Sequence, residues 1–149
     1  MRGNSVKTIS IELTDYNIYE VNTQWWKQIM SLFLKPGRDF EIRHWREEDK
    51  IVKKGSAYGI ASDADSTEFE VSIKGTLTSS AVNDILNIAA SPSDRKMTEF
   101  FTIIVCGAVS SSHYGKQLYV FNPSEELCRQ LYTILEPIKE YFTFGEYGD

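Results

Sequence analysis

The chain has 149 residues, of which 42% are hydrophobic and 13% aromatic, and its formal net charge is −5. Its length is that of one ordinary domain, and the apolar fraction is high enough to fill a core, which excludes wholesale disorder. No run approaches the roughly 20 apolar residues of a membrane helix, and the first residues lack the apolar stretch of a secretory signal. We therefore expect one globular, cytoplasmic domain over residues 1–149, with Cys106 and Cys128 reduced.

The acidic charge is concentrated towards the end of the chain. From residue 122 onward there are six acidic and two basic residues, whereas residues 1–121 carry 15 acidic and 14 basic ones. Such a surface repels nucleic-acid phosphates and attracts a basic protein. A solvated helix face is the simpler interpretation.

The first half of the chain predicts mostly strands. Residues 7–13 alternate as a strand does, and a helix follows from Asn22 or Thr23 to the Lys35-Pro36-Gly37 stop. Its apolar residues have helical spacing: Trp26, Ile29, Met30, Phe33 and Leu34. Strands are then expected at residues 40–46, 51–60 and 68–77, and three strands in series favour an antiparallel meander.

The second half alternates helices and strands. Ser79 or Ser80 caps a helix, residues 100–105 form a central strand, and residues 117–121 form its partner. Residues 122–125 resemble a capping box, Pro137 kinks or restarts the helix that follows, and the tail from residue 144 frays. The predicted fold class is α+β, with a mainly antiparallel sheet of five to six strands and about three helices packed on it.

The stretch CGAVSSSHYGKQ, residues 106–117, contains residue types that often carry chemistry. A phosphate loop needs four residues between its first glycine and the Gly-Lys pair, but seven separate Gly107 from Gly115. A nucleophile elbow needs Gly-x-Ser-x-Gly between a strand and a helix, which is not present. We interpret the stretch as a polar loop between two strands.

Two acidic stretches resemble metal sites only in part. Residues 44–49, HWREED, combine histidine with carboxylates, but the chain has two histidines, His44 and His113, and no paired ligand spacing. Residues 63–68, DADSTE, begin like a calcium loop but have Glu68 where that loop needs glycine. We predict no catalytic residues, no metal and no cofactor.

A partner-binding surface is the prediction that the sequence favours. Adjacent helical positions differ by about 100°, so Trp25 and Trp26 cannot share one stripe; Trp25 either widens the core contact or is a partly exposed interface aromatic. Exposed aromatics and acidic turns suit a protein partner. The predicted contact residues are Trp25, Trp45, Glu47, Glu48, Asp49, Asp63, Asp65 and Glu68.

In overall profile the chain resembles bacterial toxin-immunity proteins, including those of contact-dependent growth inhibition. The helix TQWWKQIMSLFL, the hairpin FEIRHWREED and the acidic C-terminal helix carry this resemblance. It implies a small acidic α+β inhibitor that binds one cognate protein toxin, often a basic nuclease, and blocks its active site. From the acidic charge and the lack of a long apolar run, we expect no direct contact with nucleic acid or membrane.

Two other functions stay open. One is a small-ligand-binding or enzymatic domain whose pocket is lined by His44, His113, Tyr114 and Lys116. The other is a self-associating domain that uses Trp25 and an edge strand. The sequence does not decide between a monomer and a homodimer.

Overall fold

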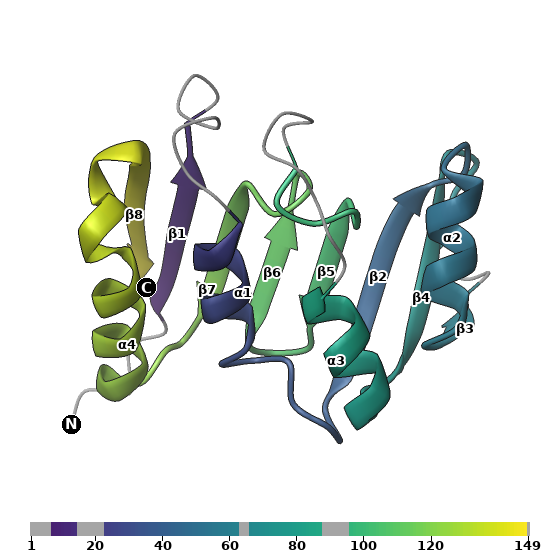
Figure 1. Ribbon diagram of the computed structural model, residues 1–149, viewed down its shortest axis with the longest axis horizontal. Coiled ribbons are helices and arrows are strands. Elements are labelled where there is room, and N and C mark those ends of the chain that lie inside the picture. The colour runs from purple at the N-terminus through teal and green to yellow at the C-terminus, as the bar shows by residue number, and fades with distance from the viewer. Residues whose placement is uncertain (1–6, 15–22, 63–65, 88–95, 149) are drawn as a thin grey trace.

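In the computed structural model, the described residues form eight strands of one antiparallel sheet, in the order β3-β4-β2-β5-β6-β7-β1-β8 (Figure 1). The structure describes residues 7–14, 23–62, 66–87 and 96–148. The strands are β1 (Lys7–Leu13), β2 (Asp39–Trp45), β3 (Ile60–Ala61), β4 (Glu70–Thr76), β5 (Thr102–Val105), β6 (Val109–Ser112), β7 (Gln117–Phe121) and β8 (Phe142–Gly148). The sheet confirms the α+β class, but the described residues contain more strands than the predicted five to six and four α-helices instead of about three.

The four α-helices of the described residues lie on the same face of this sheet (Figure 1). They are α1 (Gln24–Met30), α2 (Asp49–Ser56), α3 (Ser79–Asn87) and α4 (Glu125–Leu135), and a 3-10 helix, η3 (Glu136–Tyr141), follows α4. Because the helices cover one face only, the side chains of β1 differ in burial by face. Ile9, Ile11 and Leu13 are buried under the helices, whereas Glu12 on the other face is exposed. We call the other side of the sheet the open face.

Both tryptophans of α1 belong to the core. Trp26 is 1% exposed and Trp25 is 2% exposed, and the Trp25 ring meets the edge of Phe142 at 4.8 Å. The prediction of Trp25 as a partly exposed interface residue is therefore wrong, and the wider core contact is observed. Trp25 is buried because η3 and β8 bring Phe142 over the side of α1 that carries it. Without them, that side of the helix would be exposed to solvent.

The strand predicted at residues 51–60 is instead the helix α2, followed by the two-residue β3. Ile51 and Val52 pack against the core from one side of this helix. A Cβ atom at Gly55 would lie 2.8 Å from Ile73 and 3.3 Å from His44 Nε2. Gly55 therefore allows α2 to approach the sheet closely, rather than weakening a strand.

The stretch CGAVSSSHYGKQ contains a strand of its own. Residues 109–112 form β6, which pairs with β5 on one side and β7 on the other. The polar-loop prediction fails because the serines alternate: Ser111 is buried on the helix face, while Ser110 and Ser112 point to the open face. Two short turns, at residues 106–108 and 113–116, replace the single long loop.

The C-terminal region differs from the prediction at both ends. The predicted capping box began at Asn122, but Asn122 has a φ of 47° and precedes the helix. The N-cap of α4 is Ser124, whose hydroxyl accepts a 3.1 Å hydrogen bond from the Leu127 amide. As expected, the helix has a fresh start close to Pro137, which lies in the first turn of η3. The tail that was predicted to fray forms β8, a seven-residue strand paired with β1 along its whole length.

Candidate functional site

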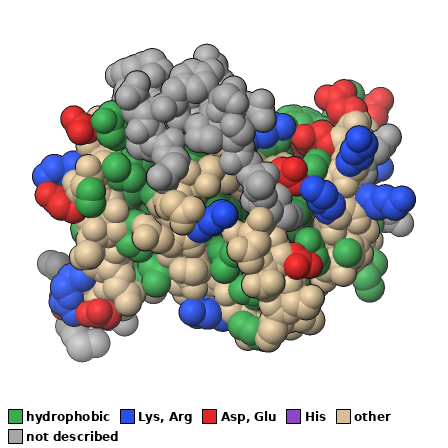
Figure 2. Space-filling view, viewed as in Figure 1, with side chains coloured by type: hydrophobic (Ala, Val, Ile, Leu, Met, Phe, Trp, Pro, Cys, Tyr) green, Lys and Arg blue, Asp and Glu red, His purple; other side chains and the backbone are tan. Residues whose placement is uncertain are grey.

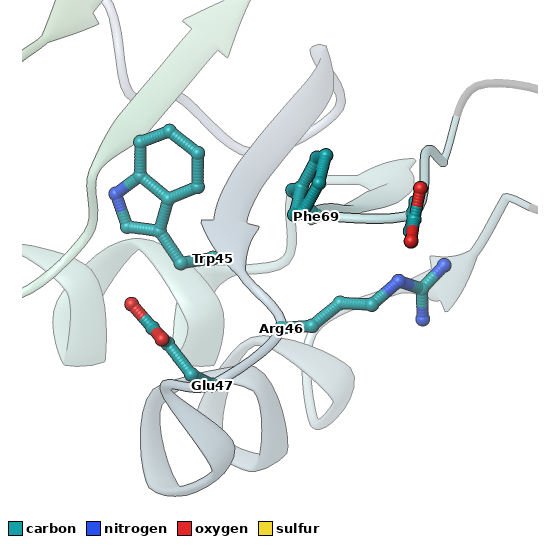
Figure 3. A pocket seen from close by; sticks show the side chains of 5 residues that line it. Trp45, Arg46, Glu47 and Phe69 are labelled. Carbon is teal, nitrogen blue, oxygen red and sulfur yellow. The ribbon is translucent and has the colours of Figure 1, made fainter.

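A pocket of about 450 Å³ lies where β2 ends and β4 begins (Figure 3). Five residues from two segments line it: Trp45, Arg46, Glu47, Glu68 and Phe69. Its two rings differ in exposure, since Phe69 is 67% exposed and Trp45 is half-buried. Glu47 points toward the Trp45 indole, whereas Arg46 extends away from it (Figure 3).

Backbone pairing just beyond the two strands brings these segments together. The Arg46 amide donates a 2.8 Å hydrogen bond to the Phe69 carbonyl, which continues the β2–β4 ladder past Trp45 and Glu70. The Arg46 Nε donates to the Thr67 carbonyl at 2.7 Å. Trp45, Glu47 and Glu68 were predicted from separate stretches of sequence, and the fold places all three at one pocket.

A chain of aromatic contacts holds Trp45 in place. Its ring lies 4.9 Å from that of Phe101, which in turn contacts the rings of Tyr114 at 5.2 Å and His113 at 5.8 Å. A ring fixed in this way loses little conformational freedom when a partner binds it. Sequence reasoning missed Phe69 and Phe101, because both lie inside predicted strands, residues 68–77 and 100–105.

Glu48 ties the pocket to the turn after β6. One carboxylate oxygen accepts a 3.1 Å hydrogen bond from the Tyr114 hydroxyl, and the other accepts one of 3.3 Å from the Trp45 amide. Burial, followed by the negative charge of Glu48, raises the pKa of Tyr114 to about 12, so this phenol stays a donor. Glu48 was predicted to contact a partner, but its carboxylate is hydrogen-bonded within the protein.

The turn that carries Tyr114 has a strained backbone. His113, Tyr114 and Gly115 have successive φ values of 53°, 57° and 87°, a left-handed conformation that costs a non-glycine residue roughly 1–2 kcal/mol. Hydrogen bonds offset this cost, because the Tyr114 carbonyl accepts from the amides of Met97 and Thr98. The Lys96 ammonium also lies 4.3 Å from the centre of the Tyr114 ring.

The remaining predicted acidic residues fall into two groups. Glu47 and Glu68 are exposed, and in the described part of the chain no ion pair involves either of them. Asp49 is the first residue of α2, but its side chain lies outside what the structure describes, as do residues Asp63 and Asp65. Figure 2 shows basic side chains over α2, whose exposed lysines are Lys50, Lys53 and Lys54.

The two histidines do not form a common site. His44 is completely buried against Phe100, at a ring distance of 5.1 Å, and so cannot line an open pocket. His113 is exposed and contacts Phe101. The predicted pocket lined by both histidines is therefore not formed, and burial alone lowers the pKa of His44 to about 4.

Ion pairs neutralise part of the acidic C-terminal region. Glu126 pairs with Arg129, Glu136 with Lys139 at 2.9 Å, and Glu146 with Lys7 at 3.1 Å. These ion pairs are solvent-exposed, which agrees with a solvated helix face. Residues 122–149 still carry more acidic than basic side chains.

Comparisons with known proteins gave no match: no family model, no curated protein and no solved structure is significantly similar to this chain. Within the described residues no group of three or more His, Cys, Asp or Glu side chains could hold a metal ion, and Cys106 and Cys128 are unpaired. The helices of these same residues are each too short or too polar to cross a membrane.

Proposed function

We propose that this protein is a binding inhibitor of the immunity-protein type, which neutralises a cognate bacterial toxin by docking it on the Trp45–Phe69 pocket. The observation that carries the proposal is the exposed aromatic pocket itself, with Phe69 67% exposed beside a fixed Trp45. Aromatic residues are enriched among the few residues that dominate binding energy at protein interfaces.

The pocket suits a lysine or arginine side chain of the partner. A cation is attracted to the faces of Trp45 and Phe69, and such contacts contribute roughly 0.5–2 kcal/mol, more as the site is desolvated. Glu47 and Glu68 add carboxylates with no ion-pair partner among the described residues. With a net charge of −5, the whole chain also accelerates encounter with a basic protein.

The first experiment captures the partner from the source organism and then measures its affinity. Tagged wild-type protein should retain one stoichiometric protein, identified by mass spectrometry, and coexpression should protect cells from that protein's toxicity. Trp45→Ala and Phe69→Ala should each weaken binding by tenfold or more in calorimetric titration, because hot-spot truncations cost about 2 kcal/mol or more.

Phe121→Ala is the matched control, since Phe121 is a partly exposed aromatic on β7, near the other end of the sheet. It should bind the partner as the wild type does. Equal affinity of the wild type, Trp45→Ala and Phe69→Ala would contradict the assignment of the pocket. Failure of the captured protein to show any toxicity that this chain relieves would contradict the inhibitor function.

A further inference from the structure

The two edges of the sheet are very different. At one edge, β3 has two residues, and a short edge strand offers little template for pairing with another chain. At the other edge, β8 has seven residues, and within the described residues no strand pairs with its outer side. Alternate residues of β8 direct their N–H and C=O groups away from β1, and no strand of the described residues meets these groups.

Devices that usually protect an edge strand are missing from β8. The strand, FTFGEYG, contains no proline and no lysine, and its one charged residue is Glu146. That carboxylate is already paired with Lys7 at 3.1 Å, and it also accepts a 3.3 Å hydrogen bond from the Tyr132 hydroxyl. The edge thus presents hydrogen-bonding groups without a charge that would repel an added strand.

Exposed apolar side chains gather at the same edge. Phe144 is 38% exposed and Tyr147 is 60% exposed, and they project to opposite faces of β8. Tyr132 of α4, 43% exposed, lies 6.4 Å from the Phe144 ring. Three partly exposed aromatic side chains therefore lie at this edge, and pairing with a second strand would shield part of their surface from water.

We propose that β8 pairs antiparallel with β8 of a second copy of this chain, so that two eight-stranded sheets join into one across a two-fold axis. The strand has Gly145 at its centre, and a two-fold axis at Gly145 pairs all seven residues of each copy. Thr143 then faces Tyr147 of the second copy on the open face, and Phe144 faces Glu146 on the helix face.

The placement of the charges favours this register, in which Tyr147 lies close to the axis on the open face. Each Glu146 lies opposite a phenylalanine rather than the second Glu146, and each keeps its own Lys7 partner. On the open face, a Cβ atom at Gly145 would lie 2.7 Å from the Ser10 hydroxyl and 3.1 Å from the Tyr147 hydroxyl, so the tyrosine lies close over the glycine.

The test is sedimentation equilibrium over a range of concentrations, with two matched variants. Wild-type protein should reach twice the 17.1 kDa mass of the chain. T143K/Y147K sets like charges opposite each other across the axis and should be monomeric, whereas T143K/Y147E sets opposite charges there and should restore the dimer. The two variants share T143K, at a position that faces Glu12 of its own β1, and they differ only at position 147, which faces Thr8 of its own β1. Thermal unfolding of both variants checks that each is folded.

A wild type that stays monomeric at high micromolar concentration would overturn the proposal. A dimer whose mass is the same in T143K/Y147K and T143K/Y147E would also overturn it, because pairing would then occur elsewhere. The proposal does not depend on the toxin-binding function, since the pocket and β8 lie at opposite ends of the sheet.

Discussion

The indole Nε1 of Trp26 donates a 3.0 Å hydrogen bond to the hydroxyl of Ser111, and both side chains are fully buried. This contact joins α1 to β6 in the centre of the molecule. Without it, the N–H group of the core tryptophan would be left unsatisfied in an apolar interior.

Ser111→Ala should therefore lower the free energy of unfolding by about 1–3 kcal/mol, the typical cost of a buried donor that loses its acceptor. The measurement is denaturant unfolding followed by circular dichroism. Ser110→Ala, next in the same strand but on the open face, should change stability by less than about 0.5 kcal/mol. Equal losses in both variants would show that the hydrogen bond is not responsible.

Gly115→Ala tests the second contact of Trp26. A Cβ atom at Gly115 would lie 2.8 Å from both Trp26 Nε1 and the Met97 Cβ, at a φ of 87°. Left-handed strain and overpacking together should lower stability by about 2–4 kcal/mol. Gly107→Ala is the control: its φ is 79°, but a Cβ there meets nothing within 4 Å, so only the backbone cost of about 1 kcal/mol should remain. Equal losses of stability in Gly115→Ala and Gly107→Ala would exclude a steric contribution at Gly115.

Local patterns predicted those elements whose burial depends on neighbours in sequence. Strand β2 was foreseen because Phe40, Ile42 and His44 alternate with polar residues, and that alternation alone assigns them to the buried face. Strand β6 was not foreseen, because the buried hydroxyl of Ser111 is satisfied by a long-range hydrogen bond from Trp26. A serine-rich stretch has no hydrophobic signal that could show this.

The candidate site was predictable only as unconnected parts. Trp45 and the acidic residues were chosen for their chemistry, but the link between Arg46 and Phe69 depends on strand pairing between segments that are more than 20 residues apart. The same limit explains β8, since residues 142–148 lack a clear alternation and become a strand by pairing with β1 at the other end of the chain. Such pairing is set by the fold rather than by local propensity.

Acid should destabilise the protein through His44. Burial lowers its pKa from 6.5 to about 4, and within the described residues neither ring nitrogen has a hydrogen-bond partner. Between these pH values the unfolded chain binds a proton that the folded chain does not, so stability falls as pH falls. The contribution of His44 to the free energy of unfolding should fall by about 3 kcal/mol between pH 7 and pH 4.

His44→Phe isolates that effect, because it removes the titrating group and keeps a ring beside Phe100. Unfolding free energies of wild type and variant should differ by a constant amount between pH 7 and pH 8.5. Below pH 6.5 the wild type should lose stability progressively relative to the variant. Parallel pH profiles of the two proteins down to pH 4 would contradict the buried, neutral imidazole.

Tryptophan fluorescence can test the placement of the pocket residue directly. Trp25 and Trp26 are 2% and 1% exposed, whereas Trp45 is half-buried, so acrylamide should quench Trp45 far more than the other two. Trp45→Phe should abolish most of the quenching, and Trp25→Phe, the control, should preserve it. Phe101→Ala should increase quenching, because the ring packed 4.9 Å from Trp45 is removed. Quenching that survives in Trp45→Phe would place an accessible indole in α1 instead, and the surface assigned to partner binding would then have to move there.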